Sequence, residues 1–214
     1  MDFASIRKEY EQAGLSREQL NGDPLALLKQ WVQVAIDQSP GAWFEANAMT
    51  LATVNSKGAV SCRVVLLKDT TDVGIKFYTN YDSRKGMELR ENPSASVVFH
   101  WPYLGRQLRV CGTVEFTSRE DSAHYFHSRP RGSQISAFVS RQSEIVESRE
   151  HLEKLSSTAD EEYADREIPL PDDWGGYHLI ATEFEFWQGR RDRLHDRFRF
   201  LKSDDQWQIE RLAP

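Results

Sequence analysis

The amino-acid sequence predicts a mainly β protein with peripheral helices, an α+β fold in which antiparallel strands close fully or partly into a barrel. Three observations support this class. Many short segments rich in β-branched residues follow one another, few helical patterns interrupt them, and their short spacing favours antiparallel pairing. Closure into a barrel removes exposed strand edges. An open α+β sandwich is the alternative that this pattern leaves open.

The composition fits one folded domain that spans residues 1–214. Of the 214 residues, 39% are hydrophobic before the 12 glycines are counted, and this length can bury a sizeable core without disulfides. The net charge of −6 argues against a nucleic-acid binder that relies on a broad phosphate-contacting surface. The two cysteines lie far apart, which indicates neither a disulfide framework nor a metal knuckle.

The N-terminal residues carry charges where a signal peptide needs an apolar stretch. No run approaches the roughly 18 apolar residues that cross a membrane. We therefore expect a protein that is neither exported nor inserted into a membrane. The few cysteines are also typical of the reducing cytoplasm, which is the expected location.

Helices are predicted at four places. Asp23 can cap the first helix, and Pro24 suits its first position. Its apolar side chains recur with helical spacing at Leu25, Leu28, Trp31, Val32, Ala35 and Ile36. Short helices are expected over residues 84–91 and 119–127, each with a capping or stop signal. The charged segment 147–165 is typical of a solvated helix.

A hairpin is predicted where residues 49–54 and 59–68 flank the turn Asn-Ser-Lys-Gly at 55–58. The segment 107–116 is also a strand, whose alternate side chains on one side are Leu108, Val110, Gly112, Val114 and Phe116. Residues 168–176 (IPLPDDWGG) are expected to form a proline-bounded loop. Further strands are predicted at 75–79, 95–101, 177–187, 197–202 and 207–212.

Basic residues of this acidic chain are concentrated at strand ends and helix starts. Arg63 and Lys68 flank the apolar sequence Val-Val-Leu-Leu, and Arg84 and Lys85 follow Ser83 at the start of a helix. A helix start offers free backbone N–H groups to an anion such as phosphate. Arg63 and Lys68 fall on opposite strand faces unless a bulge or strand end re-aims one of them. The pattern indicates an anion site, with solvated charges as the alternative.

A second basic group lies in HYFHSRPRGSQIS. Arginine can grip a phosphate with two hydrogen bonds. His124 and His127 form a pair with helical spacing, but without a third ligand they are a weak metal signal, and no metal is expected. The side chains that could converge on a phosphate across the proline turn are Tyr125, Arg129, Arg131 and Ser133.

The densest mixture of functional side chains lies in FEFWQGRRDRLHDRF. Trp187 could flank a flat ring and Gln188 could hydrogen-bond to a ligand. His195 could titrate near neutral pH beside Asp196. A core tryptophan with surface salt bridges is the alternative. The usual nucleotide, zinc-protease and hydrolase motifs are absent from the chain.

The run Glu185-Phe186-Trp187-Gln188, followed after four residues by Arg193-Leu194-His195-Asp196-Arg197, resembles the signature of the pyridoxine (pyridoxamine) 5′-phosphate oxidase family. Other segments are similar to the same family and follow its order from residue 63 to residue 214. They are RVVLLK, FYTNYDSRKG, YFHSRPRGSQI, VSRQS, PDDWGGY and the terminal RLAP.

The resemblance implies an FMN-binding split β-barrel that works as a homodimer, with FMN at the subunit interface. It implies oxidation of pyridoxine 5′-phosphate or pyridoxamine 5′-phosphate to pyridoxal 5′-phosphate in vitamin B6 metabolism. A hydride would pass from the substrate C4′ to the flavin, and O2 would then be reduced to H2O2. The two basic groups match two phosphorylated ligands, one a cofactor and one a substrate.

The resemblance also assigns site residues, some of them contributed by a partner subunit. Arg193 and His195 would be catalytic, and residues 1–20 would be a flexible segment or lid. FMN would contact Arg63, Val64, Val65, Leu66, Leu67, Lys68, Tyr78, Thr79, Arg84, Lys85, Gln107, Gln142, Ser143, Trp187 and Arg197. The substrate would contact Arg7, Lys8, Glu9, Tyr10, Lys68, Tyr125, Arg129, Ser133, Arg193, Leu194 and His195. Arg190 and Arg191 have no implied role.

Three alternatives compete with this hypothesis. Another split-barrel FMN oxidoreductase would bind flavin but would not need the RLHDR and SRPR groups. A non-catalytic carrier would bind FMN or pyridoxal phosphate stoichiometrically, without oxygen consumption. A barrel that interacts only with proteins would be colourless when purified.

Overall fold

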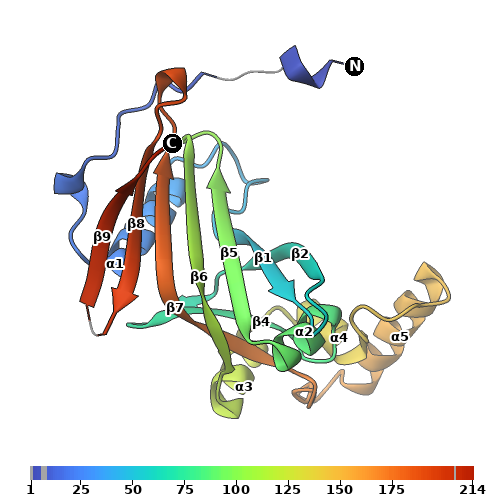
Figure 1. The fold of residues 1–214 in the computed structure, drawn as a ribbon. Coiled ribbons are helices and arrows are strands. Elements are labelled where there is room, and N and C mark those ends of the chain that lie inside the picture. The colour runs from blue at the N-terminus through green and yellow to red at the C-terminus, as the bar shows by residue number, and fades with distance from the viewer. Residues whose placement is uncertain (1, 6–8, 205) are drawn as a thin grey trace.

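The computed structural model describes residues 2–5, 9–204 and 206–214, and its centre is one antiparallel sheet (Figure 1). The strands are β1 (Ala48–Val54), β2 (Val60–Leu66), β3 (Asp69–Thr70), β4 (Gly74–Asn80), β5 (Ser94–Trp101), β6 (Arg106–Phe116), β7 (Trp174–Gln188), β8 (Asp196–Ser203) and β9 (Gln206–Leu212). They are ordered β2-β1-β5-β6-β7-β4-β3, and β8 pairs with both β7 and β9.

Helices surround this sheet. The α-helices are α1 (Pro24–Asp37), α2 (Arg84–Glu91), α3 (Arg119–Ser128), α4 (Arg131–Val139) and α5 (Arg149–Glu162). Short 3-10 helices are η1 (Phe3–Ser5), η2 (Arg17–Gln19) and η3 (Arg191–Arg193). Figure 1 shows α3, α4 and α5 at the end of the molecule away from the β7–β8 connection. None of the described helices is long and apolar enough to cross a membrane.

The long strand β7 divides the sheet into two diverging parts. Its first half pairs with β4 as far as Ile180, and its second half pairs with β8 from Glu183 onward. Strand β6 runs along its other edge, with a register shift between Cys111 and Gly112 close to the division. An extra residue in one strand increases local bending and twist. The predicted mainly β, antiparallel, partly closed barrel is therefore confirmed.

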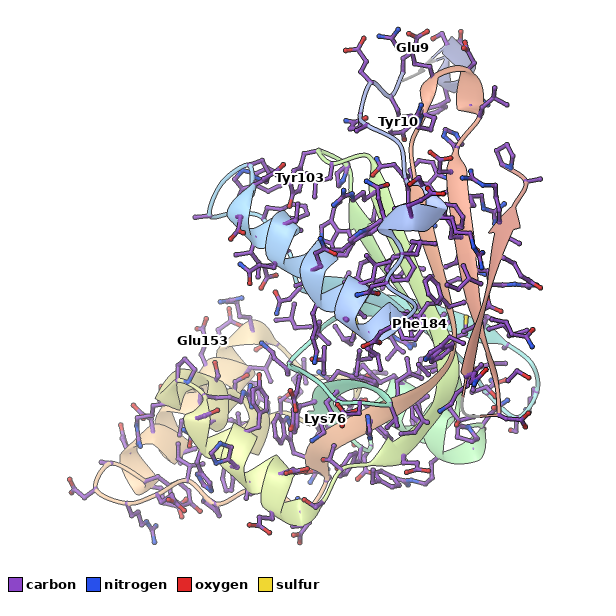
Figure 2. All side chains as sticks on the ribbon, turned by 90° about the vertical axis from the view of Figure 1, so that its left-hand side faces the viewer. Glu9, Tyr10, Lys76, Tyr103, Glu153 and Phe184 are labelled. Atoms are coloured by element: carbon purple, nitrogen blue, oxygen red, sulfur yellow. The ribbon has the colours of Figure 1, made fainter. Side chains whose placement is uncertain are left out.

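Two clusters of apolar side chains stabilise the fold. The larger lies inside the barrel, where Trp31 of α1 contacts Phe186 with ring centroids 5.0 Å apart. Figure 2 shows Phe184 in this interior. The smaller cluster lies among the helices at the end of the sheet and consists of Phe126, Ile135, Ala159, Ile168 and Trp174. The helices α3, α4 and α5 thus have a core of their own, which fixes them against the start of β7.

The predicted helices and strands occur within a few residues of their expected bounds. Asp23 caps α1 as expected, since its carboxylate accepts from the backbone N–H groups of Leu25 and Ala26. Two apolar residues depart from the predicted patterns, because Ile36 is 51% and Phe116 is 55% exposed. Each lies at the end of its element, where the core no longer covers the side chain.

The two-residue strand β3, helix α4 and the start of β7 differ from the sequence prediction. Helix α4 was not predicted, because the Pro and Gly residues of SRPRGS indicate a turn, whereas Pro130 precedes the first helical residue, where its missing N–H costs nothing. The predicted loop 168–176 ends early, since β7 begins at Trp174. Gly175 and Gly176 serve close packing within β7, because a Cβ there would lie 2.1 Å from the Tyr81 hydroxyl and 2.5 Å from Thr117 Oγ1, respectively.

Candidate active site

A cavity of about 450 Å³ lies between β2, β4 and the helices α3 and α4. Many residues that the sequence assigned to cofactor or substrate line it: Val64, Val65, Leu66, Lys68, Tyr78, Thr79, Lys85, Tyr125, Arg129, Ser133 and Gln142. Sequence reasoning missed the other lining residues, which are Asn80, Pro130, Ser136, Ala137, Ser140 and Trp174. Strand β2 ends at Leu66, so Lys68 is free of the strand alternation and lines the cavity.

A buried ammonium group lies at one side of this cavity, in the first turn of α2. The Nζ atom of Lys85 donates to Thr79 Oγ1 at 2.9 Å, Ser83 Oγ at 3.0 Å and Gln142 Oε1 at 2.5 Å. These partners are neutral, and no carboxylate pairs with Lys85 in the described part of the chain. Burial, with a contribution from Arg63, lowers the pKa of Lys85 to about 8. An anion bound here would supply the missing negative charge.

Arg63 and Arg84 converge on a carboxylate that sequence reasoning did not single out. Glu88 of α2 accepts from Arg84 Nε at 2.9 Å and pairs with Arg63 Nη2 at 3.3 Å. Burial raises the pKa of Glu88, but hydrogen bonds from Ser61, Thr53 and the two arginines outweigh it and hold the pKa at about 2. The signal that could have found Glu88 is its place four residues after Arg84 on one helix face.

A second cationic group lies where α3 ends and α4 begins. The guanidinium of Arg129 lies 4.8 Å from the centroid of the Trp174 ring. Its Nη1 atom is buried and has no hydrogen-bond partner among the described residues. Tyr78 and Tyr125 stack beside it with centroids 4.1 Å apart. Because buried guanidinium donors are normally paired, this one is well suited to an anionic ligand.

Other residues of this region face elsewhere. Arg131 pairs with Asp160 of α5 at 2.8 Å and does not line the cavity. Leu67 is buried in the barrel core. The Ser143 hydroxyl accepts from the backbone N–H of Arg84 at 3.2 Å, which places Ser143 beside the start of α2. Within the described ranges, no three His, Cys, Asp or Glu side chains are grouped to hold a metal ion.

A second group of candidate residues surrounds the connection between β7 and β8. The His195 ring lies 4.6 Å from Trp187 and 5.6 Å from Tyr10, measured between centroids. Its Nδ1 accepts from the backbone N–H of Arg190 at 3.1 Å. Burial and the charge of Arg193 lower the pKa of His195, so the ring is neutral at pH 7 and carries its proton on Nε2.

Asp196 follows His195 in the sequence, but its carboxylate does not pair with the His195 ring. Its carboxylate accepts from the backbone N–H of Leu15 at 3.1 Å and from Arg211 at 2.7 Å, and Arg190 lies 3.7 Å away. The side chain of Gln188 is likewise used internally, because it donates to the backbone carbonyls at 104 and 105. Both residues therefore hold the loop in place.

Gln107, Trp187 and Arg197 lie side by side across β6, β7 and β8. The adjacent residues Leu108, Phe186 and Phe198 on the same three strands point into the core, so this row lies on the outer face of the sheet. Arg193 and Leu194 are exposed beside it. Of the predicted lid, Glu9 is exposed, Tyr10 packs near His195, and residues 7 and 8 lie outside the described residues.

Two further arginines follow Gly189, and the sequence left their role open. Arg191 pairs with Glu11 at 3.2 Å, and Arg190 binds His195 through its backbone as described above. These contacts join the N-terminal segment to the β7–β8 connection. Asp192 and Arg193 both have positive φ angles, 55° and 60°, which are uncommon for residues other than glycine. Arg193 is exposed in this turn.

The cavity and the group of residues around His195 lie at opposite ends of the strand β7. Trp174 lines the cavity at the start of β7, and Trp187 lies near the end of the same strand. At about 3.3 Å per residue, the strand between them is roughly 40 Å long. Figure 2 shows Tyr10 at one end of the molecule and Glu153 of α5 at the other. The connection between β7 and β8, residues 189–195, is called the His195 loop below. A single subunit therefore does not bring its own cavity and its own His195 loop together.

The comparison with known proteins decides the family. Residues 41–158 match the family model described as pyridoxamine 5′-phosphate oxidase. The chain belongs to the pyridoxamine 5′-phosphate oxidase family. Residues 174–214, which include the His195 loop, match the C-terminal dimerisation region of pyridoxine 5′-phosphate oxidase. The family resemblance seen in the sequence is thus confirmed.

Members of this family match the chain along its whole length. The pyridoxine/pyridoxamine 5′-phosphate oxidase of Salinibacter ruber is 50% identical over 215 residues, which cover 99% of both chains. That of Nostoc punctiforme is 48% identical over 212 residues, covering 99% of this chain and 98% of the relative.

Solved structures agree with the fold. PhzG from Burkholderia lata, crystallised with tetrahydrophenazine-1-carboxylic acid, is 29% identical with a TM-score of 0.87, covering 95% of this chain and 99% of that chain. An FMN-binding protein of Nostoc punctiforme related to pyridoxamine 5′-phosphate oxidase has a TM-score of 0.67 at 15% identity, with 94% and 98% coverage. The second likeness concerns the fold alone.

Proposed function

We propose that this protein oxidises pyridoxine 5′-phosphate and pyridoxamine 5′-phosphate to pyridoxal 5′-phosphate, with FMN as cofactor and O2 as electron acceptor. The relatives named above support the reaction. The observation that carries the proposal is the pair of cations in one cavity, Lys85 and Arg129, neither of which pairs with a carboxylate among the described residues. Two such cations match two phosphorylated ligands.

The residues around Lys85 fit the phosphate of FMN. A buried ammonium, neutral hydroxyl and amide groups and the first turn of α2 together favour a doubly charged anion. Arg63 and Arg84 add positive charge, which Glu88 partly offsets. The strand residues Val64, Val65 and Leu66 would lie along the flavin. Bound FMN would supply the acceptor for the hydride that leaves C4′ of the substrate, and O2 would reoxidise it with formation of H2O2. With pyridoxamine 5′-phosphate, water would then add at C4′ and ammonia would be released.

The residues around Arg129 fit the phosphate of the substrate. The unpaired Nη1 of Arg129 would donate to a phosphate oxygen, with Lys68, Tyr125 and Ser133 as further donors. Burial raises the pKa of the neighbouring Tyr78 to about 12, so its hydroxyl stays protonated and neutral. Stacking of Tyr78 on Tyr125 would keep this side of the cavity rigid.

The second half of each site would come from the partner subunit of a homodimer. The outer face of the sheet carries Gln107, Trp187 and Arg197 in one row, and the match to a dimerisation region covers the last two of them. We infer that this row contacts FMN held by the other subunit. The length of β7 between Trp174 and Trp187, roughly 40 Å along the strand, supports this arrangement.

Arg193 and His195 would act on the substrate ring. Neutral His195 would donate its Nε2–H to the ring hydroxyl and hold it in place, because Nδ1 is occupied by the backbone N–H of Arg190. The exposed Arg193 guanidinium would press the ring toward the flavin and offset negative charge that develops there. In this proposal neither residue removes a proton as an obligatory base.

An oxygen-electrode assay with purified protein and FMN tests the proposal. Pyridoxine 5′-phosphate and pyridoxamine 5′-phosphate should each be oxidised with O2 uptake, H2O2 formation and the absorbance of pyridoxal 5′-phosphate. Pyridoxine without its phosphate is the matched control and should react poorly. Bound flavin without turnover of either substrate would favour a carrier or another split-barrel oxidoreductase and would contradict the proposal.

FMN affinity is expected to fall at alkaline pH because of Lys85. The pKa of this lysine is about 8 in the ligand-free protein, so the ammonium is charged below that pH and is lost above it. A bound phosphate stabilises the charged form, so affinity weakens as pH rises through 8, by about tenfold between pH 8 and pH 9.5. Flavin fluorescence titrations measure this dependence. Riboflavin lacks the phosphate, so its affinity should depend less on pH. An equal pH dependence for both ligands would contradict the assignment of Lys85 to the FMN phosphate.

A further inference from the structure

A buried carboxylate lies on the outer face of the sheet, where most side chains are partly exposed. The side chain of Glu185 in β7 is only 4% exposed, although its strand neighbours Phe184 and Phe186 point to the opposite face, into the core. Arginines on both adjacent strands cover it. Glu185 pairs with Arg109 of β6 at 2.7 Å and with Arg197 of β8 at 2.7 Å.

The contacts of Arg197 define the orientation of its guanidinium group. One carboxylate oxygen of Glu185, Oε1, accepts from Arg197 Nε at 2.8 Å and lies 2.7 Å from Nη2. The remaining terminal nitrogen, Nη1, donates to the backbone carbonyl of Ala213 at 2.8 Å. A guanidinium held at all three nitrogens has one orientation, and an N–H on each terminal nitrogen remains for a ligand.

This arrangement joins three separate segments of the C-terminal region. Glu185 begins the EFWQ sequence, Arg197 ends the RLHDR sequence, and Ala213 belongs to the terminal RLAP. Arg197 lies opposite Trp187 in the β7–β8 register. The contacts of Arg197 with Glu185 and with the Ala213 carbonyl, called the Arg197 clamp here, therefore hold the guanidinium on the strand next to that indole. Neither Glu185 nor Ala213 needs to reach the ligand for this effect.

We propose that Glu185 is a positioning residue for flavin binding, which acts by orienting the Arg197 guanidinium toward FMN held by the partner subunit. The inference rests on the proposed function, since Arg197 matters in this way only if the protein binds FMN. A carboxylate in this place costs desolvation, and the ion pairs with two arginines offset that cost. The orientation that it gives to Arg197 explains why a carboxylate lies at this place in the sheet.

Glu183 provides a matched control on the same strand and the same face. It also pairs with Arg109, at 2.8 Å, and its side chain is 21% exposed. Among the described residues it forms no ion pair with Arg197. A substitution of Glu183 therefore removes a carboxylate that pairs with Arg109, but it leaves the ion pair between Glu185 and Arg197 in place.

The test compares FMN dissociation constants of the dimeric wild-type protein, Glu185→Gln and Glu183→Gln by flavin fluorescence quenching. Glu185→Gln should weaken FMN binding at least about fivefold, as expected for losing a charge-assisted clamp, and Glu183→Gln less than about twofold. In an Arg197→Ala background, Glu185→Gln should have no further effect on FMN affinity, although it would still lower Tm if it also weakens packing.

Three results would overturn the inference. They are an unchanged FMN affinity in Glu185→Gln, an equal loss in Glu183→Gln, and an undiminished loss in the Arg197→Ala background. If Glu185→Gln does not fold, Glu185→Asp replaces it, because the shorter side chain keeps the charge and moves it away from Arg197. A wild-type protein that does not bind FMN would instead overturn the proposed function, and this inference with it.

Discussion

Substitution of Arg129 by alanine should raise the KM for pyridoxine 5′-phosphate about 10- to 100-fold, because a charge-assisted contact with phosphate contributes about 1.5–3 kcal/mol. The side chain lies over the Trp174 ring at 4.8 Å, and its buried Nη1 has no partner among the described residues. Removing it therefore breaks no ion pair in the ligand-free protein. FMN affinity should change little, since the groups around Lys85 remain in place.

The control for this variant is Arg131→Ala. Arg131 lies two residues farther along the chain and carries the same charge, but it pairs with Asp160 outside the cavity. Its KM should stay close to that of the wild type. Steady-state kinetics with the phosphorylated substrate measure both variants. An unchanged KM in Arg129→Ala, or equal changes in the two variants, would remove Arg129 from the phosphate site.

Substitution of Lys85 by methionine should weaken FMN binding about 10- to 100-fold, because the buried ammonium would supply a charge-assisted contact to the cofactor phosphate. The stability of the ligand-free protein should not fall. A buried ammonium with only neutral partners is costly to maintain, and methionine has a similar length and no charge. Fluorescence titration and thermal unfolding without FMN measure the two effects.

Riboflavin binding and a substitution of a second lysine are the controls. They distinguish the loss of a phosphate contact from a general disturbance of the flavin site. The affinity for riboflavin should be nearly the same in the wild type and in Lys85→Met. Lys76→Met should leave FMN binding unchanged, because Lys76 of β4 pairs with Asp69 and Asp121 and does not line the cavity. A loss of riboflavin affinity as large as the loss of FMN affinity would contradict the phosphate assignment.

Most of the fold is predictable from the sequence because it depends on local patterns. The alternating apolar residues of β6 and the Asp-Pro start of α1 are local signals, and both elements occur where the sequence predicts them. Helix α4 was missed because Pro130 and Gly132 also occur in turns. The early start of β7 was missed because Gly175 and Gly176 are needed for packing against Tyr81 and Thr117, which only the tertiary structure shows.

The sequence predicts many residues of the candidate site, but it does not predict how their side chains are arranged. The family resemblance names Arg63, yet no local pattern shows that its guanidinium turns to Glu88, because that carboxylate is 25 residues away. The unpaired state of Arg129 depends equally on contacts between segments. The pairing of Asp196 with Leu15 and Arg211, and not with His195, depends on segments near both termini.

We propose that each active site takes its phosphate cavity from one subunit and its His195 loop from the other. Mixing two variants that are impaired at low substrate concentration, Arg129→Ala and Arg193→Ala, tests it most directly. In each mixed dimer, one site would carry both substitutions and the other site would carry neither. Random reassortment makes about half of the dimers mixed, so roughly a quarter of wild-type activity should return. Oxidation of low concentrations of pyridoxine 5′-phosphate is measured, with differently tagged subunits to count mixed dimers. Mixed dimers that form without any recovery of activity would contradict the shared site.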